Sequence, residues 1–166
     1  PMGFDVGLFF ANLLLAYFSQ RGWADCKGED RSTQGAWLLD TFNSTWTVFE
    51  KRFLEQWNEQ GVRDDCGGLS PAILFGAGVA DGANALKAHQ EAYMKQIWED
   101  SLEFAGAEMI RRIIGIAHVA DLDKIPDADV RARCERAALM CGRELMLNAK
   151  KLTPASIVDV VTSQEV

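Results

Sequence analysis

Residues 46–57 have the sequence WTVFEKRFLEQW. The aromatic residues of this stretch recur at spacings of three and four: Trp46, Phe49, Phe53 and Trp57. Such spacing places the four rings on one face of an α-helix. We interpret this stripe as part of a core. A dimer face or one wall of an apolar ligand pocket would show the same periodicity, so both alternatives stay open.

Outward from this stretch, the rest of the chain also favours helices. The 166 residues include only four prolines, and no alternating strand pattern extends over five residues. The sequence therefore predicts an all-α fold of six or so helices, forming a single helical domain over residues 1–166. The predicted helices run from an N-cap at Asp5 to about Ser19, from Ser32 or Thr33 to about Gln60, from about Asn84 to Leu102, from Phe104 to Val119, from Asp127 to about Lys151, and for a short distance after Thr153-Pro154.

Two glycine-containing stretches separate these helices. Gly22–Asp30 is predicted to be a polar loop, and Gly61–Gly82 a longer loop with one short helix at Pro71–Phe75. Gly76-Ala77-Gly78 begins like a nucleotide-binding glycine loop, but no strand precedes it and the third glycine is misplaced. This motif therefore indicates an ordinary loop. Gly106 is expected near a junction between two helices.

Composition limits the partners of this chain. Seventeen basic and 24 acidic residues give a net charge of −7, which repels nucleic acid and anionic membrane surfaces. The longest apolar stretch, Val6–Phe18, is interrupted by Asn12 and is shorter than the ~20 residues of a membrane-spanning helix. No positively charged region precedes it, so neither a signal peptide nor a membrane partner is expected.

The four cysteines indicate reduced thiols rather than a metal site. Cys26, Cys66, Cys134 and Cys141 form no CxxC motif, and the two histidines lie far from them in sequence. In one helix, Cys134 and Cys141 would be ~10 Å apart along the axis, which is too far for a disulfide. A cytoplasmic protein with no bound metal is expected.

Two adjacent arginines interrupt the otherwise apolar segment FAGAEMIRRIIGIAHV, residues 104–119. At about 100° per residue, one arc of this helix holds Met109, Ile110, Ile113, Ile114, Ile116 and Ala117. The other arc holds Glu108, Arg111, Arg112, Gly115 and His118. Because the apolar arc is wide, the helix is expected to be mostly buried, with its polar arc facing a cleft. Gly115 would leave room for a small anion or polyol beside both guanidinium groups.

A purely structural interpretation of the same residues is also open. The polar arc could be a solvated face with an ion pair between Glu108 and Arg112, one helical turn apart. For His118, a structural histidine with satisfied hydrogen bonds is favoured over a catalytic one.

Several separated motifs resemble those of 5-methylthioribose kinases. They are Pro1-Met2-Gly3-Phe4-Asp5-Val6-Gly7, Ala11-Asn12-Leu13, Ala16-Tyr17-Phe18, Trp46, Phe49, Lys51-Arg52-Phe53, Trp57, Tyr93-Met94, Asp100-Ser101-Leu102, Met109-Ile110-Arg111-Arg112-Ile113-Ile114-Gly115-Ile116-Ala117-His118-Val119 and Cys134-Glu135-Arg136. The resemblance covers nearly the whole chain and is weakest from Val62 to Ala88.

The resemblance implies a two-lobed, protein-kinase-like fold related to aminoglycoside and choline kinases. Such an enzyme phosphorylates the 1-hydroxyl of methylthioribose with ATP and magnesium, in methionine salvage, as a homodimer. This chain would be the C-terminal part of its helical lobe. The glycine-rich loop, the His-Gly-Asp catalytic loop and the magnesium-binding Asp-Pro-Glu would all precede Pro1, so this chain alone is expected to be inactive and to bind neither ATP nor magnesium.

The same resemblance implies roles for three residues. Arg111 and Arg112 would contact the substrate and the phosphoryl group in transit, and Asp5 would brace the catalytic loop. Two other functions remain open: a freestanding helical module that binds a small anion or a partner protein, and part of a related kinase with another alcohol substrate.

Overall fold

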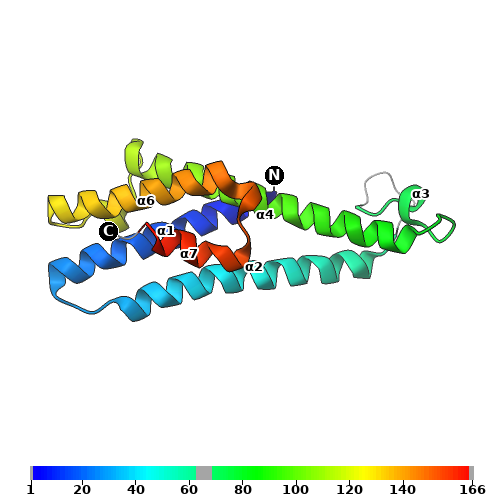
Figure 1. The fold of residues 1–166 in the computed structure, drawn as a ribbon, viewed down its shortest axis with the longest axis horizontal. Coiled ribbons are helices and arrows are strands. Elements are labelled where there is room, and N and C mark those ends of the chain that lie inside the picture. Colours follow the sequence, from blue (N-terminus) through cyan, green and yellow to red (C-terminus); the bar gives the residue numbers. More distant parts are fainter. Residues whose placement is uncertain (1, 63–68, 165–166) are drawn as a thin grey trace. The chain divides into compact units, whose positions relative to one another are not determined.

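The computed structural model describes residues 2–62 and 69–164. Its helices are α1 (Met2–Lys27), α2 (Ser32–Gln60), α3 (Ala72–Phe75), α4 (Gly82–Ile114), α5 (Ala120–Asp123), α6 (Ala128–Asn148) and α7 (Ile157–Thr162), with the 3₁₀ turns η1 (Ala149–Lys151) and η2 (Pro154–Ser156) before α7 (Figure 1). The structure is 82% helical, and its described residues form no β-strand. The predicted all-α fold is confirmed.

The chain divides into two compact units. The larger unit comprises Pro1–Ser44 and Ile97–Val166, and the smaller unit comprises Thr45–Gln96. Helices α2 and α4 each contribute residues to both units. That residues 1–166 form a single domain stays a prediction.

Helix α1 lies at the centre of the larger unit and packs against α5 and α6 (Figure 1). Small residues bring it close to α4 as well, because a Cβ added at Gly7 would lie 2.6 Å from the carbonyl oxygen of Ser101. Aromatic rings from three helices then fill the core: Phe10, Phe42 and Trp98 contact one another with ring centroids 4.0–6.2 Å apart. This core fixes the register between α1 and the second half of α4.

Helix α1 is longer at both ends than the sequence predicted. Asp5 lies in its first turn instead of capping it, and the helix continues through the predicted loop at Gly22 as far as Lys27. Gly22 is buried against α6 and the segment before it, where an added Cβ would lie 2.7 Å from Ile125 Cδ1 and 2.9 Å from Cys134 Sγ. This glycine therefore serves close packing inside a helix, which sequence alone does not distinguish from a helix end.

The prediction that the first apolar segment is too short for a membrane-spanning helix was also wrong. Helix α1 has 26 residues, and its most apolar window has a mean hydropathy of 1.5, so by length and composition it could cross a membrane. Half of that window is buried inside the protein. The core helix of a globular protein can have the same length and composition. Helix α1 packs against α5 and α6, as such a core helix does.

Helix α4 replaces two predicted helices. It runs without interruption through Gly106, where the sequence predicted a junction. A Cβ at Gly106 would collide with the carbonyl oxygen of Gly142 and lie 2.7 Å from Met146 Cγ. The two glycines, Gly106 and Gly142, let α4 and α6 approach until their backbones touch. Gly106 is thus a packing residue, like Gly22.

In the smaller unit the aromatic stripe of α2 forms part of a core. Trp46 and Trp57 are buried, whereas Phe49 and Phe53 are half-buried. Tyr93 of α4 lies against Phe53 and Trp57, with ring centroids 5.9 and 5.3 Å apart. The interpretation of the stripe as core is confirmed for its two tryptophans.

Other helix ends lie where the sequence predicted them. Asp127 caps α6 by accepting hydrogen bonds from the backbone N–H groups of Asp129 and Val130, both at 2.9 Å. Thr153 and Ser156 form a capping box around Pro154 at the start of the last helical segment. Helix α2 spans Ser32–Gln60 as predicted.

The short helix α3 also follows the prediction. It starts after Pro71 and ends at Phe75, inside the predicted loop. In the same loop the backbone N–H of Gly76 donates to the carbonyl of Ala72 at 2.8 Å, so this amide belongs to the helix end. The stretch Asp64-Asp65-Cys66-Gly67-Gly68 of the loop lies outside the described residues.

The described cysteines are free thiols, as predicted: Cys26, Cys134 and Cys141. Cys66 lies outside the described residues. Burial raises the pKa of the Cys134 thiol, and it raises that of Cys141 from 9.0 to about 12. Deeply buried thiols with raised pKa values react slowly.

The shift at Cys141 predicts a stability change at alkaline pH. The thiol ionises near pH 9 in the unfolded chain and only near pH 12 in the folded one. Stability is therefore complete below pH 9 and falls as the pH rises towards 12. In urea unfolding, the free energy of unfolding at about pH 10 should be lower than at pH 8 by about 1 kcal/mol because of the Cys141 thiol. The variant Cys141→Ala should lose that part of the pH dependence, and an unchanged profile would contradict the assignment.

Candidate functional site

The predicted arginine pair lies in the last turn of α4. Arg111 and Arg112 are three and two residues from the end of the helix at Ile114. Positive side chains in a last turn interact favourably with the C-terminal end of the helix dipole. This stabilises the helix end whether or not a ligand binds.

Helix α4 ends at Ile114, so the two arcs predicted for a helix over residues 104–119 are partly wrong. Gly115 and His118 lie beyond the helix, and His118 is exposed, so it is not the structural histidine that was favoured. Ile114 is 70% exposed and Ile116 is fully exposed, although both were assigned to the buried arc. A Cβ at Gly115 would collide with the carbonyl oxygen of Arg111, to which the Gly115 N–H donates at 3.0 Å. Glycine at this position thus lets the chain leave the helix.

Glu108 fixes the orientation of Arg111. The Nε and Nη2 atoms of Arg111 each donate to a different Glu108 carboxylate oxygen, both at 2.7 Å. The carboxylate is mostly buried, with 11% of its side chain exposed, whereas 55% of the Arg111 side chain is exposed. Hydrogen bonding and charge attraction from Glu108 raise the pKa of Arg111 above its ordinary value. The result is a guanidinium held by two hydrogen bonds on a side chain that is more than half exposed.

This pairing replaces the one that the sequence suggested. An ion pair between Glu108 and Arg112 was one prediction, but Arg111 takes the carboxylate instead. Arg112 is half-buried, and its Nε atom is buried without a hydrogen-bond partner among the described residues. A buried donor left unsatisfied costs about 1–3 kcal/mol, so this position favours an acceptor supplied from outside the described residues.

A groove of about 340 Å³ lies beside Arg111, between the start of α1 and the end of α4. It is lined by Phe4, Leu8, Phe104, Ala107, Glu108 and Arg111. The rings of Phe4 and Phe104 meet edge to face, with centroids 5.3 Å apart and planes at 88°. The groove thus has an apolar wall and, at Arg111 and Glu108, a charged end.

Of the residues that line the groove, sequence reasoning singled out Glu108 and Arg111 but neither phenylalanine of the apolar wall. The signal was available in part, because Phe4 stands in the N-terminal motif next to Asp5. Only the packing of α1 on α4 brings it to Phe104. Asp5 is exposed in the first turn of α1 and is not among the residues that line the groove.

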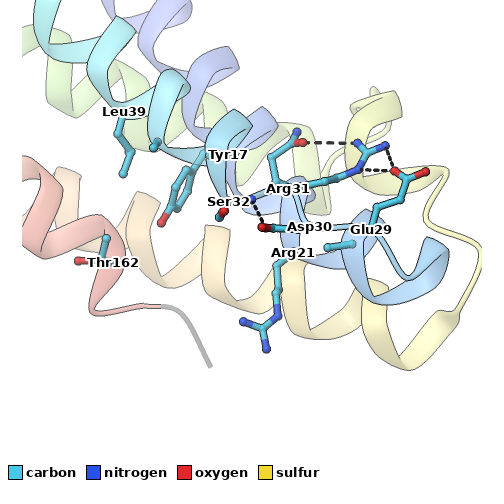
Figure 2. A pocket seen from close by; sticks show the side chains of 12 residues that line it. Tyr17, Arg21, Glu29, Asp30, Arg31, Ser32, Leu39 and Thr162 are labelled. Carbon is cyan, nitrogen blue, oxygen red and sulfur yellow. Dashed lines mark hydrogen bonds and ion pairs between the residues drawn. The ribbon is translucent and has the colours of Figure 1, made fainter.

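A larger cavity, of about 520 Å³, lies elsewhere in the larger unit and contains none of the predicted site residues. Figure 2 shows Arg31 beside Glu29, and Asp30 beside Ser32. Arg31 Nη1 donates to Gln20 Oε1 at 3.5 Å. Arg31 donates to Glu29 at 3.0 and 3.2 Å, while Asp30 accepts from the Ser32 N–H at 2.9 Å, which lowers the pKa of Asp30. Arg31 is thus paired with Glu29 and Asp30 is hydrogen-bonded to Ser32, and these contacts lie between the end of α1 and the start of α2. We therefore regard the smaller groove as the better candidate.

The described residues also bear on a metal site. Within residues 2–62 and 69–164, no three His, Cys, Asp or Glu side chains come together in a way that could hold a metal ion.

Comparison with known proteins gives the groove a context. The chain is 42% identical over 146 residues to methylthioribose kinase 2 of Oryza sativa subsp. japonica, covering 88% of this chain and 32% of that protein. Over almost its whole length, the chain is similar to methylthioribose kinases. The methylthioribose kinase of Escherichia coli O45:K1 is 40% identical over 151 residues, covering 91% of this chain and 34% of the relative. That of Yersinia enterocolitica is 34% identical over 161 residues, covering 97% and 35%.

The resemblance to methylthioribose kinases that the sequence motifs indicated is thereby confirmed. The chain spans about a third of the length of the curated relatives it matches. No family model matches the chain.

Proposed function

We propose that this chain is the C-terminal, substrate-side helical part of a methylthioribose kinase. The full-length enzyme would transfer a phosphoryl group from ATP to the 1-hydroxyl of methylthioribose, in methionine salvage. The observation that carries the proposal is the sequence identity of 42% with a methylthioribose kinase over 88% of the chain. Arg111, which lines a groove, and its neighbour Arg112 support it, because phosphoryl transfer requires fixed positive charge.

Arg111 and Arg112 would supply that charge. During phosphoryl transfer, negative charge spreads over three equatorial oxygens, and catalysis consists largely of positioning and electrostatic stabilisation. Arg111 is held in place by Glu108 while more than half of its side chain stays exposed, and the Arg112 Nε lacks a partner among the described residues. Glu108 would act as a positioning residue, and Asp5 would brace the catalytic loop from the first turn of α1.

ATP and magnesium would be held by other parts of the full-length enzyme. ATP supplies the transferred phosphoryl group, and magnesium would neutralise part of its charge. The two arginines of this chain approach only the sugar and that group. For the same reason we propose that this chain alone does not turn over substrate.

Exposed apolar side chains next to the arginine pair support a larger assembly. Ile114 is 70% exposed and Ile116 is fully exposed. Exposed apolar surface of this kind often marks a contact with another part of a protein. In this proposal the rest of the kinase lobe covers it, and the full-length enzyme is a cytoplasmic homodimer without nucleic-acid or membrane partners.

The proposal is tested with purified full-length protein, ATP, magnesium and methylthioribose. Phosphorus NMR should show a sugar phosphate on the 1-hydroxyl, formed only when all components are present. The 166-residue chain under the same conditions serves as the inactive comparison. Preferred transfer to another alcohol would favour a related kinase. Absence of transfer to any alcohol would contradict the proposal and favour a helical anion-binding or interaction module.

A further inference from the structure

We propose that the apolar wall of the groove, formed by Phe4, Leu8, Phe104 and Ala107, binds the methylthio end of the sugar and sets selectivity against sugars that carry a hydroxyl there. This inference rests on the proposed function. These four residues would contact the methylthio group, which distinguishes methylthioribose from ribose.

The shape of the groove supports this assignment. Its wall carries two aromatic rings, Phe4 and Phe104, set edge to face with centroids 5.3 Å apart. Phe4 is 43% exposed even though it packs against Phe104. Leu8 lies one helical turn after Phe4 on α1, and Ala107 lies one turn after Phe104 on α4. Two helices thus present an open apolar surface at one place.

The chemistry of the sugar matches this surface. In methylthioribose a methylthio group replaces the 5-hydroxyl of ribose, so one end is apolar and the rest is a polyol. Thioether sulfur makes favourable contacts with aromatic rings, often at the ring edge. A hydroxyl placed against the same wall would lose its hydrogen bonds to water without replacement.

The charged end of the groove fixes the direction in which the sugar binds. Arg111 and Glu108 line the same groove as the two phenylalanines. If the methylthio group contacts the phenylalanines, the hydroxyls of the sugar extend toward the guanidinium. The 1-hydroxyl is at the opposite end of the sugar from the methylthio group, so this orientation brings the reacting end to the arginine side.

The size of the selectivity can be stated. Ribose lacks the methylthio group and carries a hydroxyl in its place, and an apolar pocket discriminates against either kind of change by about 10- to 200-fold. We therefore expect kcat/KM for methylthioribose to exceed that for ribose by about 100-fold in the full-length enzyme.

The test measures kcat/KM for methylthioribose and ribose in full-length enzyme carrying Phe4→Ser. The ratio of the two values should fall at least about tenfold, through loss of methylthioribose turnover. The matched control is Phe9→Ser, since Phe9 is also on α1 and 47% exposed but does not line the groove. This control should leave the ratio unchanged.

A second variant tests the inference even where Phe4→Ser does not fold. Ala107 is exposed, and Ala107→Gln should narrow the groove and lower turnover of methylthioribose more than that of ribose. Suppose that the wild-type enzyme phosphorylates methylthioribose and that both variants show the wild-type ratio of kcat/KM for methylthioribose to kcat/KM for ribose. The inference is then wrong, and the proposed function stands. If wild-type enzyme phosphorylates neither sugar, the proposed function itself fails.

Discussion

Replacing Arg111 with alanine in the full-length enzyme should lower kcat at least about tenfold, because the proposed function makes Arg111 a preorganised donor to the developing negative charge. Removal of one such donor costs about 10²–10³ in other enzymes. The protein should stay folded, since Arg111 is more than half exposed and its pair with Glu108 lies within a single helix. Steady-state kinetics and a circular dichroism spectrum measure the two parts of the prediction.

The chain offers a matched control for this variant. Arg133 is also paired with a carboxylate, Asp25, at 3.3 Å, and 57% of its side chain is exposed. Arg133 does not line the groove, so Arg133→Ala should leave kcat unchanged. Near-native turnover in Arg111→Ala, or equal losses in both variants, would contradict the role of Arg111.

Gly106→Ala should destabilise this chain by about 2 kcal/mol, although alanine is the better helix former by about 1 kcal/mol. The added Cβ would collide with the carbonyl oxygen of Gly142 and crowd Met146 Cγ at 2.7 Å. Backbone cannot move aside as the tip of a side chain can, so α4 and α6 would have to separate. Urea unfolding of the chain measures the change.

Gly35→Ala is the comparison for this substitution. Gly35 is also helical, but the nearest atom to an added Cβ is Tyr17 Cε2 at 3.5 Å, an ordinary contact. This variant should be more stable than the parent by up to about 1 kcal/mol. If both alanine variants shift stability in the same direction, the close approach of α4 and α6 at Gly106 is wrong.

The glycines show why helix boundaries were only partly predictable. Gly22 and Gly106 were interpreted as a loop and a junction because glycine disfavours helix interiors. Both lie inside helices, where the lack of a side chain allows a neighbouring helix or segment to approach. That reason is tertiary, and nothing in the local sequence contains it. Gly115, which does follow a helix end, was assigned to a helix for the opposite reason, because apolar residues continue beyond it.

Caps were predictable because their hydrogen bonds are local. Asp127 and Thr153 lie where helical segments start, as their side chains suggested. The candidate site was predictable only at its charged end, for a similar reason. Arg111 and Arg112 stand out in an apolar segment, whereas the groove beside Arg111 requires the packing of α1 on α4.

The central claim is that the Arg111 groove receives the sugar of a kinase reaction. A crystal structure of the full-length protein with methylthioribose and a non-hydrolysable ATP analogue tests this claim most directly. We predict a guanidinium nitrogen of Arg111 or Arg112 within about 3 Å of an oxygen of the sugar or the terminal phosphate. A structure with both ligands bound and neither arginine in contact with them would contradict the account.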